Sequence, residues 1–590
     1  MMLERDKRKN KKAVKLIWMA LLTLLFCAQI MTMIYFGSKK AGFHEDEYYS
    51  FYSTNRTAGL YEPDREWIDS STIRNEFVVM PGEGFRYGMV ATAQSWDVHP
   101  PFFYFLLHTV CSFFPEVFSK WLGISVNLIA FCLNFALLSW LTYMVTGHSK
   151  GMTLLVALIH GFNPIIISGV MFIRMYEWLT VFILLCACLH VYMVMKLEKE
   201  NGINRKLEWK RFLLPLMLTN YLGFLTQYYY IIFLFFIAVG FCFWNFLPCF
   251  GKRDGGRGIS IHKENLKYSV LLCMKYGSAC GISLLLAIIS YPASLSHIFR
   301  GYRGTGAVSE FLDATNTTER LGFFAELMNE YLFDGYLWLW IVVIAVMGIV
   351  VYWKMRKIKK SDMDSVSLEN GEMSLEYNKS GGGSVTTYFL LLFAVCGYFF
   401  TVSKTALLLY ETSNRYQLPI YGIVLILIIS VLYGLWKGLI VLFGWGKGEN
   451  VRRLAVAGGV LLCFLFLAGD AHAVFTGKVL FLYEEEQEDM AYARENAHIP
   501  VIILYNDVTP YNVWWCSQEL MEYDRIYFAS EGNRERITDE IICNSGKIIV
   551  YAADYDTKEE SLNMILESND GLEDYRLVSR KSLWSVYEFE

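Results

Sequence analysis

Two adjacent carboxylates follow the first long apolar segment of the chain. Asp46 and Glu47 stand in the stretch "HEDEYYSFY" (residues 44–52), shortly after an apolar run that ends near Phe36. Partial burial or a nearby cation can tune the pKa of a carboxylate just above a membrane surface, which can then act as a general base. The pair is therefore a candidate for acid–base chemistry.

A second polar pair, Asp97 and His99, lies in "DVHPPFFYF" (residues 97–105). The two prolines restrict the backbone and hold both residues on a stiff segment before an aromatic helix. A carboxylate and an imidazole two residues apart could hold a divalent metal ion or the hydroxyl group of an acceptor molecule. The spacing alone does not decide between these uses.

Other polar residues occupy short stretches between apolar segments. These are Arg174, Tyr176 and Glu177 in "FIRMYEW", the tyrosines of "LTQYYY" (residues 225–230), and Glu411, Arg415 and Tyr416 in "LLYETSNRYQLP" (residues 408–419). Taken singly, such residues are commonly interfacial anchors at helix ends. A half-desolvated carboxylate costs free energy unless it is paired, so several mixed clusters on one side favour a shared functional site.

The composition predicts a polytopic membrane protein. Hydrophobic residues make up 54% of the chain and the mean hydropathy is +0.32, values too high for an ordinary soluble protein. The formal net charge is -4, so no basic surface for nucleic acid is expected. The cysteines show neither CxxC nor paired metal spacing, which argues against a disulfide scaffold or a zinc ribbon.

Apolar runs long enough to cross roughly 30 Å of hydrocarbon predict about eleven spans. They lie near residues 14–36, 120–147, 152–171, 176–195, 212–226, 229–249, 269–291, 334–353, 386–403, 418–437 and 454–472. Because basic loops stay in the cytoplasm, the amino terminus is predicted to be cytoplasmic and the carboxyl terminus extracytoplasmic. The basic inner loops are then Lys196–Arg211, Lys252–Lys267, Lys354–Lys360 and the residues after it, and Gly446–Arg453.

Two domains are expected from this pattern. Residues 1–472 form the transmembrane domain, with a first outer loop over 37–119 and a polar, glycine-ending cytoplasmic linker over 361–384. Residues 473–590 read as a small extracytoplasmic α/β domain, with strands in "VIILYND", "RIYFAS" and "KIIVYAAD" and helices in "NVWWCSQELMEYD" and "KEESLNMILES". Cys516 and Cys543 share this region and could pair or stay free.

Several of these stretches resemble the GT-C superfamily of integral membrane glycosyltransferases, in the branch of protein O-mannosyltransferases and the lipid A aminoarabinose transferase. The matching pieces are "HEDEYYSFY", "DVHPPFFYFLLH", "NPIIISGVMFIRMYEWLT", "LGFLTQYYYIIFLF" and "NRYQLPIYG". The resemblance covers about residues 14–472, and its most specific part is the acidic pair followed by the HPP stretch. Relatives often carry histidine where this chain has Gln227, which cannot titrate and is a poor metal ligand, so no histidine chemistry is expected at that turn.

The resemblance implies a polyprenyl-phosphate sugar as donor and transfer of its sugar to an acceptor hydroxyl on the outer face. Asp46 matches the catalytic acid that deprotonates the acceptor, and Glu47 is its neighbour in the motif. Arg415, with Arg174 as a second candidate and Tyr416 beside it, would bind the donor phosphate. The remaining acceptor or metal candidates are Asp97, His99, Glu177 and Glu411.

Other functions stay open at this stage. A multi-pass transporter or flippase is the main alternative, and "HGFNPIII" (residues 160–167) is its nearest sign of a broken helix. A nonenzymatic surface protein with a partner-binding tail is a third possibility. The sequence indicates no particular cofactor, a divalent metal ion is left open, and the acceptor is lipid, glycan or protein. A bacterial plasma membrane is the expected location.

Overall fold

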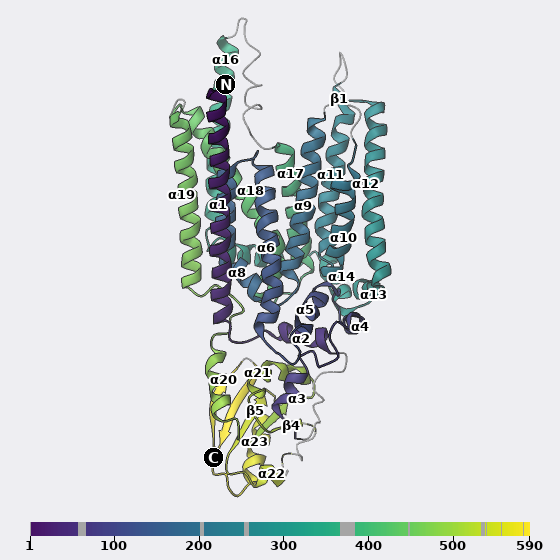
Figure 1. The fold of residues 1–590 in the computed structure, drawn as a ribbon, viewed down its shortest axis with the longest axis vertical. Coiled ribbons are helices and arrows are strands. Elements are labelled where there is room, and N and C mark those ends of the chain that lie inside the picture. The colour runs from purple at the N-terminus through teal and green to yellow at the C-terminus, as the bar shows by residue number, and fades with distance from the viewer. Residues whose placement is uncertain are drawn as a thin grey trace.

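The protein is a long helical bundle with a small mixed domain at one end (Figure 1). The computed structural model describes residues 2–56, 67–200, 206–252, 259–365, 384–445, 449–530, 532, 537, 540–555, 557–581 and 583–590. Most of the predicted linker, residues 366–383, lies outside the described residues. The amino terminus and the carboxyl-terminal domain lie at opposite ends of the bundle.

The predicted fold class, a polytopic helical protein with a small α/β domain, is confirmed. Within the described ranges, nine helices are long and apolar enough to cross a membrane, or ten if the bent pair α7–α8 counts as one span. The helices of the bundle are α1 (Met2–Lys39), α6 (Lys120–Val145), α7 (Lys150–Phe162), α8 (Pro164–Met171), α9 (Tyr176–Lys199), α10 (Leu214–Thr226), α11 (Tyr230–Phe246), α12 (Lys263–Ser290), α16 (Leu337–Ser365), α17 (Val385–Thr405), α18 (Leu418–Leu442) and α19 (Glu449–Phe475).

The expected span at 212–226 differs from the others. Helix α10 has 13 residues, which is too short to cross the hydrocarbon by itself. It continues a five-residue π-helical turn, Trp209–Leu213, and Pro215 lies at the junction. Proline removes a backbone donor and disturbs the preceding turn, which explains the change in helix geometry at this point. Helix α10 stands beside α12 in the bundle.

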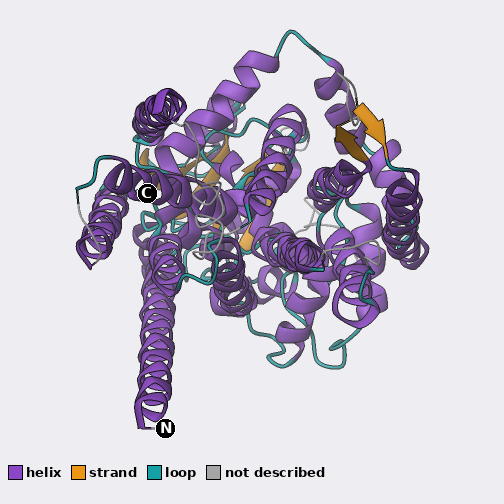
Figure 2. Ribbon diagram, turned by 90° about the horizontal axis from the view of Figure 1, so that it is seen from above, coloured by secondary structure: helices purple, strands orange, loops and turns teal. Residues whose placement is uncertain are grey.

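Helix α9 lies at the centre of the bundle, and most of its residues are buried inside the protein. Helices α6, α10, α11 and α18 pack around it. Seen from the amino-terminal end, most of the helices appear end-on, with strands of the terminal domain visible beneath them (Figure 2). Residues at the start of α9 are therefore fixed by contacts on all sides.

The predicted span 152–171 is broken at Asn163. Helices α7 and α8 meet at 58°, because Pro164 cannot continue the hydrogen bonding of α7. The side chain of Asn163 caps α8 by accepting a hydrogen bond from the Ile165 N–H at 3.2 Å. Its amide donates to Asp470 Oδ1 at 2.7 Å. The break directs α8 toward the end of the bundle where the terminal domain lies.

Short helices cover that end of the bundle (Figure 1). The first loop contributes α2 (Glu45–Asn55), α3 (Ser70–Asn75), α4 (Tyr87–Trp96) and α5 (Phe102–Ser112), and a later loop contributes α13 (Ala293–Phe299), α14 (Tyr302–Leu312) and α15 (Thr317–Leu327). Helix α2 begins with a capping box. The Asp46 N–H donates to His44 Nδ1 at 3.1 Å and the His44 N–H donates to Glu47 at 2.7 Å. This cap sets the direction of Asp46.

The terminal domain is built on a five-stranded sheet in the order β4-β3-β5-β7-β6. Strand β3 (Val501–Tyr505) pairs in parallel with β4 (Ile526–Ser530) and β5 (Ile548–Ala553), whereas β7 (Trp584–Phe589) is antiparallel to both β5 and β6 (Tyr575–Arg580). The predicted strands are present, and β6 and β7 were not predicted. The predicted helix over 512–524 is a 3₁₀ turn, Pro510–Cys516, followed by the short α21 (Ser517–Leu520).

Other features of this domain are simpler. Helices α20 (Glu486–Glu495) and α23 (Lys558–Glu567) cover the sheet, and α22 (Glu540–Cys543) is a single turn. Cys516 and Cys543 are free thiols in this structure.

The hairpin of β1 (Phe250–Lys252) and β2 (Ile259–Ile261) lies at the opposite end of the protein, between α11 and α12.

The sidedness of the two ends can be tested by cysteine labelling in intact cells. Asp524 is exposed on the terminal domain, so a cysteine introduced by Asp524→Cys should react with a membrane-impermeant maleimide. A cysteine introduced by Ser361→Cys, at the end of α16, should react after permeabilisation. The matched background is the same chain without either added cysteine. Labelling in the reverse order would contradict the predicted topology.

Candidate functional site

Charged residues from distant parts of the sequence meet where the bundle joins the terminal domain. Asp46 comes from the first turn of α2, and Arg174 comes from the turn between α8 and α9. Arg415 lies in a 3₁₀ turn, Thr412–Tyr416, just before α18. His99 lies in the segment before α5 and completes the group. We call Asp46, His99, Arg174, Arg415 and Tyr416 the Asp46 cluster.

Asp46 forms ion pairs with both arginines. Arg415 Nη1 donates to Asp46 Oδ2 at 2.5 Å, and Arg174 Nη2 lies 3.7 Å from Asp46 Oδ1. Arg174 Nη1 also donates to the backbone oxygen of Asp46 at 3.2 Å. The arginine side chains keep 4% and 5% of their surface exposed, whereas that of Asp46 keeps 27%. The Asp46 side chain is therefore less deeply buried than the two arginine side chains that it contacts.

The arginines control the charge of Asp46. Burial raises its pKa, but the positive charges of Arg415 and Arg174 outweigh this effect and hold the pKa well below its usual range. Asp46 is therefore ionised at neutral pH. It is also a weak base in this arrangement, because protonation would give up both ion pairs. The two ion pairs hold the Asp46 carboxylate against the arginines.

Arg174 is held by neutral partners as well. Its Nη1 donates to Tyr104 Oη at 3.1 Å and to Ser50 Oγ at 3.3 Å, and its Nη2 lies 2.9 Å from His99 Nε2. Burial lowers the pKa of His99 to about 4, so the ring is neutral at neutral pH and Nε2 accepts this bond. Arg174 is thereby fixed in direction.

Aromatic rings surround the guanidinium of Arg415. Its central carbon lies 5.3 Å from the centre of the Phe172 ring and 5.1 Å from that of Tyr416, distances typical of cation–π contacts. Its Nη2 donates to Tyr416 Oη at 3.3 Å. Among the described residues, the Nε atoms of Arg174 and Arg415 are buried and have no hydrogen-bond partner. Both arginines therefore keep unused donors.

Glu47 faces away from the Asp46 cluster into the protein. Its carboxylate accepts from Lys40 Nζ at 2.9 Å and from the Ile173 N–H at 2.8 Å, and both charged side chains are fully buried. Burial raises the pKa of Glu47 and lowers that of Lys40, while each ion offsets this effect on the other. The pair joins α2 to the turn that carries Arg174, so Glu47 positions Asp46 and Arg174.

The terminal domain also takes part in this arrangement. Lys40 Nζ donates to the backbone oxygen of Phe481 at 2.7 Å, and the Ala41 N–H donates to that of Leu482 at 2.7 Å. The ring of Phe481 stacks on Phe172 with a centre-to-centre distance of 4.2 Å. The chain that leaves α19 therefore closes one side of the site. No pattern in its sequence marks Phe481 as a site residue.

Besides Glu47, three predicted candidates lie outside the Asp46 cluster. Glu177 is buried at the start of α9, where its carboxylate accepts from Asn134 Nδ2 at 2.9 Å. Glu411 is exposed and precedes the turn that carries Arg415. Asp97 ends α4 and is partly exposed. It lies close enough to Arg174 for its charge to contribute to the raised pKa of that guanidinium, whose burial acts in the opposite direction.

Some residues of the site were not identified from the sequence. Tyr104 lies in α5, directly after the segment that carries His99, and its hydroxyl in an apolar stretch was the available signal. His44 begins the stretch "HEDEYYSFY" and was given no role of its own. It caps α2 through Nδ1, which lies 3.8 Å from Asp46 Oδ2, and its ring meets Trp515 of the terminal domain edge-on. Lys40 looked like an ordinary flanking lysine, because nothing local indicates that it is buried.

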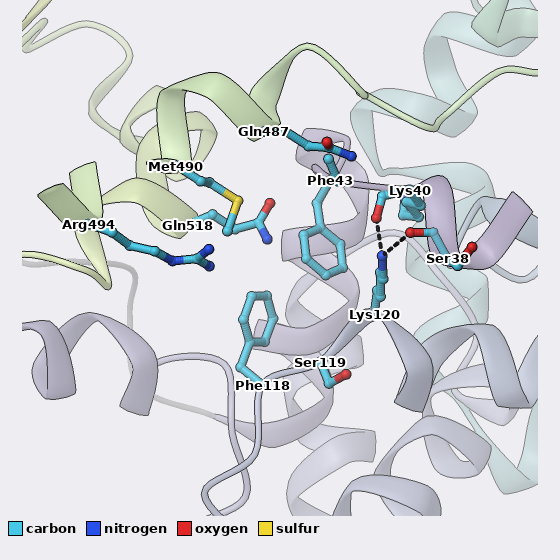
Figure 3. A pocket seen from close by; sticks show the side chains of 11 residues that line it. Ser38, Lys40, Phe43, Phe118, Ser119, Lys120, Gln487, Met490, Arg494 and Gln518 are labelled. Carbon is cyan, nitrogen blue, oxygen red and sulfur yellow. Dashed lines mark hydrogen bonds between the residues drawn. The ribbon is translucent and has the colours of Figure 1, made fainter. Parts of the chain in front are cut away.

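A cavity of about 500 Å³ lies on the other side of Lys40, where the ends of α1 and α6 meet α20 and α21 (Figure 3). Met490, Arg494 and Gln518 point into it from the terminal domain. Lys120 borders it from α6, and its ammonium donates to the backbone oxygens of Lys40 and Ser38. The Asp46 cluster does not line this cavity.

A metal ion at Asp97 and His99 was one expectation from the sequence. Within the part of the chain that the structure describes, no group of three or more His, Cys, Asp or Glu side chains is arranged to hold a metal ion. His99 Nε2 faces the Arg174 guanidinium. A cation at this nitrogen would meet a fixed positive charge, which is unfavourable.

The fold and the site define a polytopic helical protein with an acid–arginine cluster at one end of the bundle. No family model matches the chain, and no curated protein matches it. Among solved structures, the chain is similar to ArnT from Cupriavidus metallidurans bound to undecaprenyl phosphate, with a TM-score of 0.43, 10% identity and 98% of each chain covered. It is also similar to the archaeal oligosaccharyltransferase AglB from Archaeoglobus fulgidus in complex with an inhibitory peptide and a dolichol-phosphate. That match has a TM-score of 0.44 and 10% identity, and covers 97% of this chain and 74% of that one. TM-scores below 0.5 at 10% identity carry no argument about function, so the function is inferred from the chain's own site.

The buried ion pair should matter far more for stability than its exposed neighbour. Lys40→Met leaves the carboxylate of Glu47 buried without its cation, and we expect a loss of about 3–5 kcal/mol. Lys39→Met is the matched control, because Lys39 pairs with Glu484 at 3.4 Å on the surface, and should cost less than about 1 kcal/mol. Thermal unfolding in detergent measures both. Equal effects would contradict the role given to the buried pair.

Proposed function

We propose that the protein is a membrane glycosyltransferase of the GT-C type, which moves a sugar from a polyprenyl-phosphate donor to an acceptor hydroxyl on the outer face of the plasma membrane. The observation that carries the proposal is the meeting of Asp46 with Arg174 and Arg415 at one end of the bundle. This combination supplies a base and an anion-binding group side by side. It agrees with the family resemblance of the sequence around these residues.

The position of the arginines suits a lipid-linked phosphate. Arg174 precedes α9, which begins at Tyr176, and Arg415 precedes α18, which begins at Leu418. A polyprenyl phosphate carries its charge at headgroup level and its chain in the hydrocarbon, so its phosphate would meet residues at the ends of spans. Guanidinium groups bind phosphate oxygens in a bidentate way. The amino-terminal ends of the two helices add a favourable dipole.

In the proposed reaction, Asp46 takes the proton of the acceptor hydroxyl, and the oxygen attacks the anomeric carbon of the donor sugar. The bond between this carbon and the phosphate oxygen breaks, and its electrons stay on the phosphate. Arg174 and Arg415 offset the negative charge that develops there. Attack from the side opposite the phosphate inverts the anomeric centre. His99, being neutral, is suited to orient the acceptor.

A transporter or flippase is the second candidate, and the broken helix α7–α8 is the observation that favours it. Asp470, buried beside the break, pairs through Oδ1 with Asn163, and its Oδ2 has no hydrogen-bond partner among the described residues. Buried carboxylates at broken helices often mark transport pathways. Movement of a polyprenyl-phosphate sugar across vesicles without any glycosylated product would favour this alternative.

Loss of the Asp46 carboxylate should abolish transfer while the protein stays folded. We expect Asp46→Asn to lower the transfer rate by about 10²–10⁴-fold, the usual contribution of a general base. Glu411→Gln is the matched control, because Glu411 lies outside the Asp46 cluster and should keep its activity. The measurement is a transfer assay in detergent with several polyprenyl-phosphate sugars, with and without a chelator. Full activity of Asp46→Asn would exclude the assigned role.

Replacement of Arg415 tests the donor phosphate site. Arg415→Lys keeps the positive charge but loses the planar fork that matches a phosphate. We expect KM for the donor to rise about tenfold or more, with a smaller change in KM for the acceptor, because the fork contributes more than about 1.4 kcal/mol to donor binding. Steady-state kinetics with each substrate varied in turn separates the two. An unchanged KM for the donor would argue against a phosphate role for Arg415.

A further inference from the structure

We propose that the donor phosphate and Asp46 compete for the same two guanidinium groups, so that binding of the donor releases the base and departure of the lipid phosphate restrains it again. This inference rests on the proposed function and adds the regulation of that site. The observation behind it is the pair of ion pairs that Asp46 forms, with Arg415 Nη1 at 2.5 Å and Arg174 Nη2 at 3.7 Å.

Both arginines are more deeply buried than Asp46. Their side chains keep only 4% and 5% of their surface exposed, while Asp46 keeps 27%. The Asp46 carboxylate occupies Nη1 of Arg415 and lies against Nη2 of Arg174, so an anion that binds both guanidinium groups through these atoms has to displace it. Two anions so close together repel each other strongly in a partly desolvated place. A phosphate can reach both arginines only if the Asp46 carboxylate moves away from at least one of them.

The two arginines keep hydrogen-bond donors that Asp46 does not use. Nη1 and Nη2 of Arg174 form hydrogen bonds with Tyr104, Ser50 and His99 in addition to their contacts with Asp46. Its neutral partners can stay in place when a phosphate arrives, because they carry no opposing charge. The Nε atoms of both arginines are buried and unpaired within the described residues. A phosphate that replaces the carboxylate can use these donors, so it gains contacts that Asp46 does not make.

Release from the arginines changes the basicity of the Asp46 carboxylate. Once the arginines hold a phosphate, the groups that lower the pKa of Asp46 are neutralised, and its pKa rises toward the ordinary range. The carboxylate becomes a better base at the moment when the donor is in place. Before that moment it cannot readily deprotonate an acceptor. The donor is thus expected to bind before the acceptor reacts.

The proposed transfer reaction balances its bonds, electrons and proton. The acceptor oxygen forms the new bond to the anomeric carbon, the phosphate keeps the electrons of the broken bond, and Asp46 holds the acceptor's proton. A neutral carboxylic acid does not compete with the lipid phosphate for the arginines. When the lipid phosphate leaves, the unpaired guanidinium groups favour ionised Asp46, which gives its proton to water and returns to the restrained state.

The test uses the affinity of the intact protein in detergent for undecaprenyl phosphate, which needs no knowledge of the acceptor. Competition predicts that Asp46→Asn binds this lipid about tenfold more tightly than the native chain, a difference of about 1.4 kcal/mol. Asp97→Asn is the matched control. It removes a carboxylate charge that also acts on Arg174 but does not belong to the ion-paired cluster. We expect a change of less than about twofold for it.

The outcomes separate the two proposals. If the native chain binds undecaprenyl phosphate and Arg415→Gln weakens the binding, but Asp46→Asn leaves it unchanged or weaker, the competition is refuted and the proposed function stands. If the native chain does not bind the lipid at all, both are refuted. Asp46→Ala serves as a second variant, because it removes the acceptor atoms as well and should also bind more tightly. Thermal unfolding of each variant confirms that the protein compared is folded.

Discussion

The site depends on one electrostatic constraint, which is that Asp46 cannot remain charged in its half-buried position without cations beside it. A carboxylate taken partly out of water loses solvation that must be replaced. Arg174 and Arg415 replace it, although they lie 128 and 369 residues further along the chain. The fold must therefore bring the start of α2 and the starts of α9 and α18 to a single point. Most of the arrangement at this end of the bundle serves that meeting.

A second group of contacts holds these charged residues in position. The buried pair of Lys40 and Glu47 links the exit of α1, the first turn of α2 and the turn before α9. Lys40 also reaches the backbone of Phe481, where the chain enters the terminal domain. The first loop also contacts the terminal domain, through a backbone bridge between Ile68 and Ile526 at the edge strand β4. The terminal domain is thus a structural part of the site.

The elements that could be predicted are those with strong local signals. Long apolar runs gave the positions of the spans, and the continuous apolar stretches of β3, β4 and β5 were recognisable as buried strands. Strands β6 and β7 were missed because "YRLVSR" and "WSVYEF" mix charged and polar residues with apolar ones, so they lack the continuous apolar run of β3, β4 and β5. Helix α10 was expected as an ordinary span, although Pro215 and its short length produce a π-helical start.

For the site, the positions next to span ends were the predictable part. Asp46, His99, Arg174 and Arg415 all stand where apolar segments begin or end, and they meet in the structure. The direction of each side chain depends on helix phase and on remote partners, which the sequence does not show. Glu177 follows Arg174 by three residues, yet it turns into the bundle toward Asn134. Glu47 follows Asp46 directly, yet it points at Lys40, because neighbouring helical positions face different directions.

A structure of the protein with undecaprenyl phosphate, determined by electron cryo-microscopy at a resolution that shows side chains, would test the central claim most directly. The claim is that the lipid phosphate and the Asp46 carboxylate share the two arginines. We expect the phosphate within hydrogen-bonding distance of Arg174 and Arg415, with Asp46 moved away from Arg415. A phosphate bound elsewhere while the Asp46–Arg415 ion pair stays intact would contradict the account.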